Sequence, residues 1–412
     1  MSSTATHTAR LAPIRPVATL RTAVARRLTE ALLARVPVQV HLPAGQILGG
    51  GDANAPRLNL VRPESLYRRL GEHPKIGLGE AYMEGDWTAG EGTDLADALA
   101  PFASQLESLL PKPVVSLRRL ADSALPQHHR GTPENAAVNV SAHYDLSNEL
   151  FTAFLDPSMT YSSALFVGPE PLPEQDLQQA QWRKIDRALD AAGVGEGTSL
   201  LEIGTGWGEL ALRAAERGAR VISITLSAEQ QHLAQERIAA AGLADRVEVR
   251  LQDYRAVTGQ FDAIVSIEMI EAVGDEFWPD FFATIDNRLV PGGRAVIQAI
   301  LMDHHRYLAT RHSHGWIQEY IFPGGLIPSL AAIDGVLARH TTLQRAETFA
   351  FGRHYAETLR RWRASFTDAW GSIASEHFDE RFRRMWEFYL AYCEAGFRTG
   401  YLDVAQLTLR RI

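Results

Sequence analysis

A glycine-rich segment in the middle of the chain carries the first residues that could do chemistry. In LLEIGTGWGEL, residues 200–210, an apolar run is followed by Gly204 and Gly206. Glycine lets the backbone turn sharply and lets a ligand approach where a Cβ would block it, although such a loop can also simply turn a corner. Glu202 lies two residues before the first glycine, and Glu209 stands where a dinucleotide fingerprint has glycine or alanine. A carboxylate beside the loop suits a cationic ligand and repels a pyrophosphate. The segment therefore favours S-adenosylmethionine over a nicotinamide or flavin nucleotide.

The ends of the next two predicted strands could complete the same site. The second strand ends in ITLSAEQQ without the usual ribose-binding acid, and Thr225 and Gln230 could supply hydroxyl and amide contacts instead. The third strand ends in LQDYRAV, where Asp253 could accept a hydrogen bond from an adenine amino group and Tyr254 could stack on the ring. The simpler interpretation of these two residues is a turn acid and a half-buried aromatic, and taken alone they favour it.

Two acids three residues apart form a second candidate group. Glu268 and Glu271 lie in SIEMIEAVG, directly after a predicted strand. If that strand ends near residue 268, the spacing could place both carboxylates at one cavity. Paired carboxylates raise the pKa of one member, which suits a general base. The alternative is that Glu268 forms a salt bridge or lies near the cofactor.

Alternating strands and helices must position these groups. The expected helices are 174–193, 207–217, 228–241 and 276–289, and the expected strands are 199–204, 220–226, 247–252, 261–268, 294–301 and a last one in AQLTLRRI. Alternation at this spacing implies βαβ units and a mostly parallel sheet. We therefore expect an α/β protein with a Rossmann-like class I S-adenosylmethionine-dependent methyltransferase domain.

The first third of the chain has a different pattern. Apolar residues at positions 20, 24, 28, 31, 32 and 36 follow helical spacing with arginines between them. Short strand-like runs (38–42, 57–61) and helical stretches (64–71, 93–110) follow, and prolines and a glycine within 111–137 indicate a linker. We expect a smaller N-terminal α+β domain over residues 17–120, a linker over 121–137 and the catalytic domain over 138–412.

Composition excludes several classes of function. The 412 residues are 46% hydrophobic and carry a formal net charge of −8, so no nucleic-acid partner is expected. Cys393 is the single cysteine, no signal-peptide pattern is present, and no apolar run reaches the ~18 residues of a membrane span, so a cytoplasmic protein is expected. No metal-binding spacing of histidines or cysteines occurs, so no metal site is expected. Six arginines within residues 1–36 fit either a solvated terminus or a docking surface for anionic lipid headgroups.

Seven collinear segments resemble the cyclopropane-fatty-acyl-phospholipid synthases and the mycolic-acid methyltransferases. They are HYDLSNELF (143–151), LDPSMTYSSALF (155–166), LEIGTGWGEL, ITLSAEQQ, QDYR, YIFPGG (320–325) and HYAETL (354–359). The resemblance runs from about residue 76 to the C-terminus. It implies cofactor contacts by Tyr161, Ser162, Gly204, Gly206, Thr225, Gln230, Asp253 and Tyr254. The missing acid of the second strand is normal in this family.

The resemblance also implies a substrate and a reaction. Family members transfer a methyl group to the double bond of an acyl chain through a carbocation, which aromatic faces can stabilise. The N-terminal third resembles the extra domain of the members that act on phospholipids. We therefore expect unsaturated phospholipids as partners and a location peripheral to the inner face of the cell membrane. Aromatic residues are frequent in 362–401, where most are expected to be helix core and some to line the acyl channel.

The family's base is a bicarbonate ion, and its ligands are only partly present. The resemblance assigns Glu271 and Tyr355 as ligands, and Ser163 stands at a position where the family uses the backbone amide of a cysteine. Gln298 replaces the family's histidine, and a neutral amide can be neither a cation nor a titrating partner, which argues against bicarbonate. Cys393 matches a family cysteine near the active site, although a buried cysteine is commonly a small apolar filler.

The departures SIEMIEAVG, with Ala272 in place of a histidine, and VIQAI resemble one subgroup, the actinobacterial methylene-fatty-acyl-phospholipid synthases. The resemblance then implies a methylene-branched product, the precursor of 10-methyl branched acids, and a separate reductase that acts on it. A cyclopropane product formed at the same double bond is the alternative. A homodimer is a further expectation, because closed symmetric assemblies are common.

Overall fold

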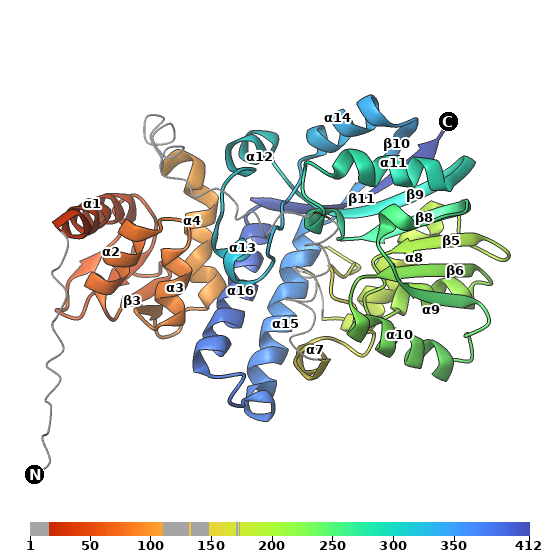
Figure 1. Cartoon of the computed structure of the whole chain (residues 1–412). Coiled ribbons are helices and arrows are strands. Elements are labelled where there is room, and N and C mark those ends of the chain that lie inside the picture. The colour runs from red at the N-terminus through yellow and green to blue at the C-terminus, as the bar shows by residue number, and fades with distance from the viewer. Residues whose placement is uncertain (1–15, 110–131, 133–147, 170–171, 173) are drawn as a thin grey trace, which may run out of the picture. The chain divides into compact units, whose positions relative to one another are not determined.

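The computed structural model describes residues 16–109, 132, 148–169, 172 and 174–412 (Figure 1). Contacts between residues divide the chain into two units, Met1–Asp94 and Leu95–Ile412. The sequence predicted the domain boundary further along, after residue 120. The helix α4 (Leu95–Leu109), expected in the N-terminal domain, instead packs on α16 (Glu380–Arg398), where Asp97 pairs with Arg398. The predicted linker 121–137 lies outside the described residues apart from Thr132.

The first unit is a small α+β fold, as the sequence predicted. Its elements are α1 (Pro16–Leu33), β1 (Gln39–His41), β2 (Ile47–Leu48), β3 (Arg57–Leu60), α2 (Pro63–Glu72), α3 (Gly77–Met83) and β4 (Trp87–Ala89). The strands form a sheet in the order β2-β1-β3-β4. The fully buried Asp86 accepts hydrogen bonds from Arg62, Arg69 and Ser65, which compensates for the burial of its charge.

The second unit is built on a seven-stranded sheet. Its strands are β5 (Ser199–Ile203), β6 (Arg220–Thr225), β7 (Val247–Leu251), β8 (Phe261–Ile267), β9 (Leu289–Met302), β10 (Leu343–Ala350) and β11 (Leu402–Arg411). They lie in the order β10-β11-β9-β8-β5-β6-β7, and β11 is antiparallel to both of its neighbours while the other pairs are parallel. The predicted α/β class with a mostly parallel sheet is confirmed.

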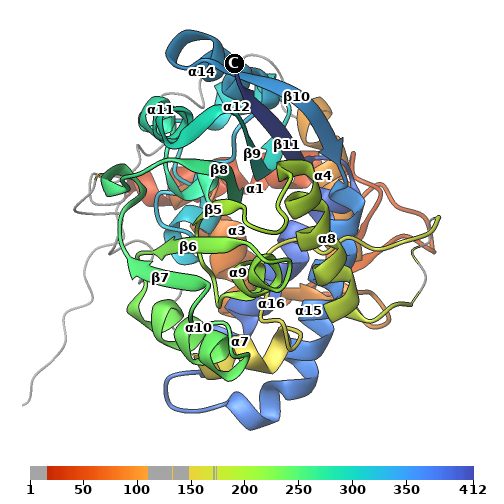
Figure 2. The same ribbon diagram turned by 90° about the vertical axis from the view of Figure 1, so that its right-hand side faces the viewer.

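Helices cover both faces of this sheet. The helices are α7 (Asn148–Phe154), α8 (Leu177–Ala192), α9 (Glu209–Glu216), α10 (Ala228–Ala240), α11 (Trp278–Arg288), α12 (His304–Thr310), α13 (Trp316–Tyr320), α14 (Leu330–His340) and α15 (Gly352–Ile373), with short 3₁₀ turns η2 (Tyr254–Ala256) and η3 (Ile270–Ala272). Figure 2 shows the strands between α11 and α14 on one side and α8 and α9 on the other.

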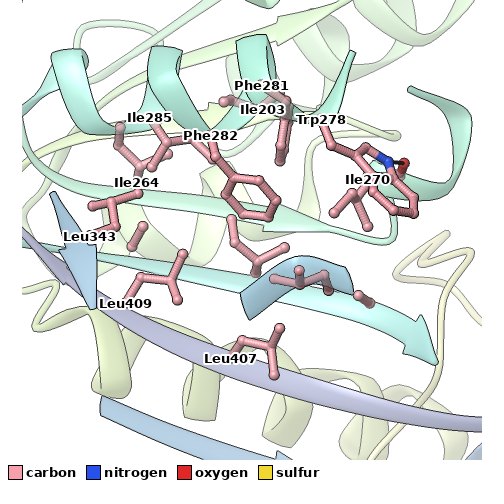
Figure 3. Packing of buried hydrophobic residues seen from close by; sticks show 14 of the residues in the cluster. Ile203, Ile264, Ile270, Trp278, Phe281, Phe282, Ile285, Leu343, Leu407 and Leu409 are labelled. Carbon is pink, nitrogen blue, oxygen red and sulfur yellow. Dashed lines mark hydrogen bonds between the residues drawn. The ribbon is translucent and has the colours of Figure 1, made fainter. Parts of the chain in front are cut away.

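The alternation of side chains along each strand produces two separate cores. Leu200 and Val296 pack with α8, α9 and α10, whereas their neighbours Leu201 and Ile297 pack with α11 and α14. The second core is shown in Figure 3, where the indole N–H of Trp278 donates to the carbonyl of Ile270 over 3.1 Å. Burial on both faces explains why central strands such as β8 are largely apolar in the sequence.

Two long C-terminal helices complete the unit. α15 and α16 pack on each other, and α15 also contacts α7 and β11. Their aromatic residues are mainly core, as expected: Trp362, Phe366, Trp386, Phe388, Tyr389 and Phe397 are all buried. Among the described residues, no helix combines the length and the apolar character that crossing a membrane requires.

Candidate active site

The candidate residues gather where the parallel strands end. Gly204 follows β5, Thr225 closes β6, Asp253 comes two residues after β7, and Glu268 is the first residue after β8. The carboxyl ends of parallel strands lie at one edge of a sheet, so the fold brings together residues that are up to 64 positions apart.

The glycine-rich turn has the geometry of a ligand cradle. Gly204 and Gly206 have φ values of 99° and 52°, in the left-handed region that glycine adopts without steric penalty. A Cβ built on Gly204 would lie 2.7 Å from the Cγ of Met269, whereas one built on Gly206 would meet no atom within 4 Å. Gly206 therefore borders open space, which fits the prediction that the cofactor approaches the backbone at this point.

Glu202 supports this turn from inside the sheet. Its side chain is buried, and its Oε2 lies 2.5 Å from the hydroxyl of Ser223, which lies 2.7 Å from Oγ1 of Thr205 in the turn. Burial raises the pKa of Glu202 to about 8, against the opposing effects of Ser223 and Lys184. Glu202 is a buried acid that holds the turn, because β5 directs this side chain into the protein. Its contact with the cofactor stays a prediction.

Thr225 and Gln230 form one hydrogen-bonded unit at the end of β6. The Thr225 hydroxyl donates to Oε1 of Gln230 over 2.8 Å and accepts from the backbone N–H of Ser227 over 3.1 Å. Ser227 in turn caps α10 by accepting from the backbone N–H of Gln230. The two predicted cofactor contacts are therefore adjacent, on the strand end and on the helix start that faces it.

The surroundings of Asp253 and Tyr254 fit the simpler interpretation, in which Asp253 is a turn acid and Tyr254 is a packed aromatic residue. Asp253 caps η2 and accepts from both Nε and Nη2 of Arg255, over 2.8 and 2.7 Å. Burial acts to raise the pKa of Asp253, but the hydrogen bonds from Arg255 outweigh it and the pKa is lowered. Tyr254 is buried in the core, where its ring packs edge-on against Phe281, and burial raises its pKa to about 12. Their cofactor contacts stay predictions.

The segment 161–163 joins the cofactor side of the site to the acids. The Tyr161 hydroxyl lies 2.7 Å from that of Tyr389, and its ring lies 5.2 Å from that of Trp362. The Ser162 hydroxyl accepts from Nζ of Lys184 over 2.5 Å. The Ser163 backbone N–H donates to Oε1 of Glu268 over 3.0 Å. The contact at Ser163 thus uses the backbone amide, as the resemblance implied, but the acceptor is a side chain of this protein.

The two acids after β8 differ in their surroundings. Besides Ser163, Glu268 accepts from Nε2 of Gln298 over 2.7 Å and from the Tyr355 hydroxyl over 2.6 Å. Glu271 accepts from the backbone N–H of Ile300 over 2.6 Å, and its Oε2 is buried without a hydrogen-bond partner. Burial and repulsion by Glu268 raise the pKa of Glu271 to about 8. Burial also raises the pKa of Glu268 above its ordinary value, and Lys184 and the three hydrogen-bond donors oppose this shift.

The surroundings of Glu268 and Glu271 indicate which of the two carboxyl groups is ionised. A carboxylate with three donors and a nearby ammonium group is stabilised in its ionised form, whereas an acid with one donor and a negative neighbour keeps its proton. We therefore take Glu268 as the ionised member of the pair and Glu271 as the neutral one. Glu268 also has a φ of 52°, unusual for a residue other than glycine, and holding it there costs about 1–2 kcal/mol. Such strain is concentrated at functional sites.

Lys184 and Gln406 also belong to this site, and only Lys184 has a signal in the sequence. Lys184 lies between Ala180 and Ala188 on the buried face of α8, at spacings of four residues, and a lysine on an apolar stripe is rarely buried without a partner. Burial lowers its pKa to about 8, against the opposing effects of Glu268, Asp156 and Glu202. Gln406 lies opposite Gln298 in the β11–β9 pair, and this pairing across the sheet is not readable from spacing.

Cys393 lies on α16 near the tyrosines of the site. Burial raises the pKa of its thiol to about 12, and its charge would interact with both Tyr355 and Tyr389. A thiol with that pKa is neutral at physiological pH, so Cys393 is not suited to be a nucleophile or a base. The structure supports the interpretation of a small filler next to the active site.

The fold and the site together define a Rossmann-like methyltransferase, with a glycine cradle after the first strand and acids at the end of the fourth strand of its sheet. The family model described as "Mycolic acid cyclopropane synthetase" matches residues 132–407. The chain belongs to this family.

Comparisons with individual proteins agree. The chain is 49% identical over 402 residues to the tuberculostearic acid methyltransferase UfaA1 of Mycobacterium tuberculosis, covering 97% of this chain and 93% of that protein. It is 33% identical to the cyclopropane-fatty-acyl-phospholipid synthase of Escherichia coli, covering 87% and 89%. The crystal structure of mycolic acid cyclopropane synthase CmaA1 complexed with SAH and CTAB matches with a TM-score of 0.59 and 30% identity, covering 70% of this chain and 99% of that one. The chain is thus an enzyme, an S-adenosylmethionine-dependent fatty acyl methyltransferase.

Proposed function

We propose that the enzyme methylates the cis double bond of an unsaturated acyl chain in a phospholipid and releases a methylene-branched acyl chain. The observation that carries the proposal is that aromatic faces and an ionised acid share one site. Tyr161 and Trp362 lie with ring centroids 5.2 Å apart, and Trp362 contacts Tyr355, which donates to Glu268. A carbocation reaction needs both groups, because the positive charge must be stabilised and a proton must then be removed.

The residues of the site divide this work. When bound at the Gly204–Gly206 turn, S-adenosylmethionine supplies a methyl group on a positively charged sulfur that an alkene can attack. Tyr161, Trp362 and Tyr389 present π faces that stabilise a cation on the acyl chain. The packing of Tyr161 and Trp362 with Phe151 and Phe154 excludes water, which would trap the cation as an alcohol. A carboxylate then accepts one proton from the cation and restores a neutral lipid.

The identity of the proton that leaves decides the product. Loss from the new methyl group with ring closure gives a cyclopropane, whereas a hydride shift followed by loss from that methyl gives an exocyclic methylene. The changes at Ala272 and Gln298 favour the methylene product, and so does the 49% identity to a protein named for tuberculostearic acid. The 33% identity to a cyclopropane synthase supports ring closure as the second candidate.

Proton NMR of the product decides between the two. The purified enzyme is incubated with S-adenosylmethionine and oleoyl phospholipid vesicles, and the fatty esters are then released. Mass alone does not distinguish the products, since both add one CH₂. We expect vinylidene proton signals that are absent when S-adenosylmethionine is omitted. High-field ring protons as the only new signals would contradict the methylene product and establish a cyclopropane synthase.

We further propose that α1 docks on an anionic membrane. Leu20, Val24 and Leu28 are spaced by four residues and are 67%, 48% and 56% exposed, and Arg21 and Arg27 beside them are also exposed. An apolar stripe flanked by arginines is typical of helices that lie in a lipid interface.

Vesicle sedimentation tests this docking. The triple variant L20S/V24S/L28S should lose binding to vesicles containing phosphatidylglycerol, whereas I47S, which removes an equally exposed side chain in the same unit, should bind as wild type does. Equal binding of the triple variant and wild type would contradict the docking role of α1.

A methylene branch must gain two hydrogens to become a methyl branch. We therefore propose a hydride-donating reductase as a functional partner that acts on the product of this enzyme.

A further inference from the structure

The carboxylate of Glu268 fills a cradle made of three hydrogen-bond donors. The donors come from three separate elements: the backbone N–H of Ser163 before α8, the amide of Gln298 on β9 and the hydroxyl of Tyr355 on α15. All three donor residues are buried, with exposed fractions of 0%, 0% and 6%. Donors that converge from distant segments on one point form a binding site for an anion, and here the anion is covalently part of the chain.

The neighbouring residues fix the direction of the Gln298 amide. Nη1 of Arg187 donates to Oε1 of Gln406 over 2.8 Å, so Nε2 of Gln406 must face the other way. That Nε2 donates to Oε1 of Gln298 over 3.1 Å and to the carbonyl of Lys184 over 3.0 Å. The oxygen of Gln298 is therefore occupied, and its NH₂ group is directed at Glu268. This relay makes the neutral amide a dedicated donor to a carboxylate.

The backbone also holds Glu268 in place. The N–H of Glu268 donates to the carbonyl of Gln298 over 2.8 Å, which extends the β8–β9 pairing by one residue. The left-handed conformation of Glu268 then turns the chain into η3. Strand pairing fixes the backbone of Glu268, and the three donors fix its carboxylate.

This arrangement does not fit a separate bicarbonate ion. The groups that the family resemblance assigns to bicarbonate include the amide at 163, the side chain at 298 and the hydroxyl of Tyr355. All three already donate to Glu268, and a second anion would meet a negative charge at that point. We infer that this enzyme carries its own anion in the form of Glu268, and that the Glu268 carboxylate, rather than a bound ion, takes the proton from the cation.

The inference rests on the proposed methyl transfer and specifies its base. In the step, a C–H bond of the cationic acyl chain breaks, its electron pair forms the new C–C bond or C=C bond, and the proton binds to Glu268. Glu268 becomes a neutral acid and later releases the proton to water, which restores the ionised form. Atoms and charges balance without an oxidant, a reductant or an external base.

The test removes the side chain and returns an anion from solution. E268G empties the cradle and suits the φ of 52°, while E268Q keeps the size of the side chain without the charge. We expect both variants to lose about 10²–10⁴-fold in methyl transfer, the range of a general base. Formate or bicarbonate should restore a substantial part of the E268G activity, chloride at equal ionic strength should not, and wild type should work equally well in bicarbonate-free buffer. E248Q, a change in an exposed acid paired with Arg250 on β7, is the control and should act as wild type does.

Anion binding gives a second readout that is independent of turnover. With ¹³C-bicarbonate as the probe, NMR should show binding to E268G and none to wild type. Formate should also raise the thermal unfolding temperature of E268G but not that of wild type. Wild-type activity that requires bicarbonate, or E268G that is active without any added anion, would overturn the inference. If neither wild type nor any variant transfers methyl groups, the proposed function fails. The anion-binding results alone then decide whether Glu268 occupies an anion site.

Discussion

Removing the hydroxyl of Tyr355 should shift the pH dependence of methyl transfer. This hydroxyl donates to Oε2 of Glu268 over 2.6 Å, and a hydrogen bond to a charged group contributes about 1.5–3 kcal/mol. The bond stabilises the ionised form of Glu268, so its loss raises the pKa of that carboxyl. At 1.36 kcal/mol per unit, the expected rise is about 1–2 units. The Y355F variant keeps the aromatic ring, which packs on Phe397 with centroids 4.4 Å apart, so the change in shape is small.

The assay is the rate of methyl transfer at saturating substrates across a range of pH. The rate requires ionised Glu268, so it rises with pH through the pKa of that group. In Y355F this acidic limb should move to higher pH by about 1–2 units. The rate should fall about 10–100-fold below the shifted pKa and recover above it.

Tyr307 offers a matched control, because its buried hydroxyl donates to Asp275 over 3.1 Å outside the site. Y307F should leave the acidic limb unchanged. Binding of S-adenosylhomocysteine, measured by thermal stabilisation, checks that both variants are folded. A Y355F profile that drops equally at every pH would refute the reasoning, since Tyr355 would then act without tuning Glu268.

Three further predictions concern the cofactor turn, a buried acid and the thiol. Burial raises the pKa of Glu202 from 4.5 to about 8, so the folded state binds more protons than the unfolded state between these values and stability falls as pH rises through them. Denaturant unfolding should show E202Q close to wild type at pH 4.5 and more stable by about 3–5 kcal/mol at pH 9; equal differences at both pH values would contradict this. G206A should weaken binding of S-adenosylhomocysteine at least about tenfold in calorimetry while destabilising the fold by only about 1 kcal/mol, because the added methyl enters open space at a φ of 52°; unchanged affinity would place the ligand elsewhere. Cys393, with a pKa of about 12, should react with iodoacetamide roughly 10²–10³-fold more slowly at pH 7.5 than a free cysteine thiol does, and a comparable rate would show that the thiol is accessible and ionised.

The sequence predicted the elements of the catalytic unit well. The expected strand 261–268 is β8 (Phe261–Ile267), and the expected helix 228–241 is α10 (Ala228–Ala240). Both segments have strong local signals in the sequence. β8 is a largely apolar run, and Ser227 precedes α10 as a helix cap. The predicted linker 121–137 stays a prediction, whereas the packing of α4 could not be predicted, because its partner α16 is about 300 residues away along the chain.

The site was predicted in part. Spacing correctly placed Gly204 and Gly206 at a turn after the strand β5. It also placed Glu268 at the end of the strand β8. The role expected for Glu202 required knowing which way β5 directs its side chain, and this depends on the packing of the whole sheet. Lys184 could have been found from its place on the apolar stripe of α8, whereas Gln406 could not, because its partner Gln298 belongs to a different strand.

The sequence by itself determined the methyltransferase class, the turn that can admit a cofactor and the presence of two acids near one strand end. The turn and the pair of acids are local features, since each depends on residues within about one turn or one strand of each other, and the class follows from the order of such segments along the chain. Only the tertiary structure decided what the two acids do. The three donors to Glu268 come from residues 163, 298 and 355, and no spacing rule relates these positions. Their convergence is a property of strand order and helix packing, and it separates an ionised Glu268 from a neutral Glu271.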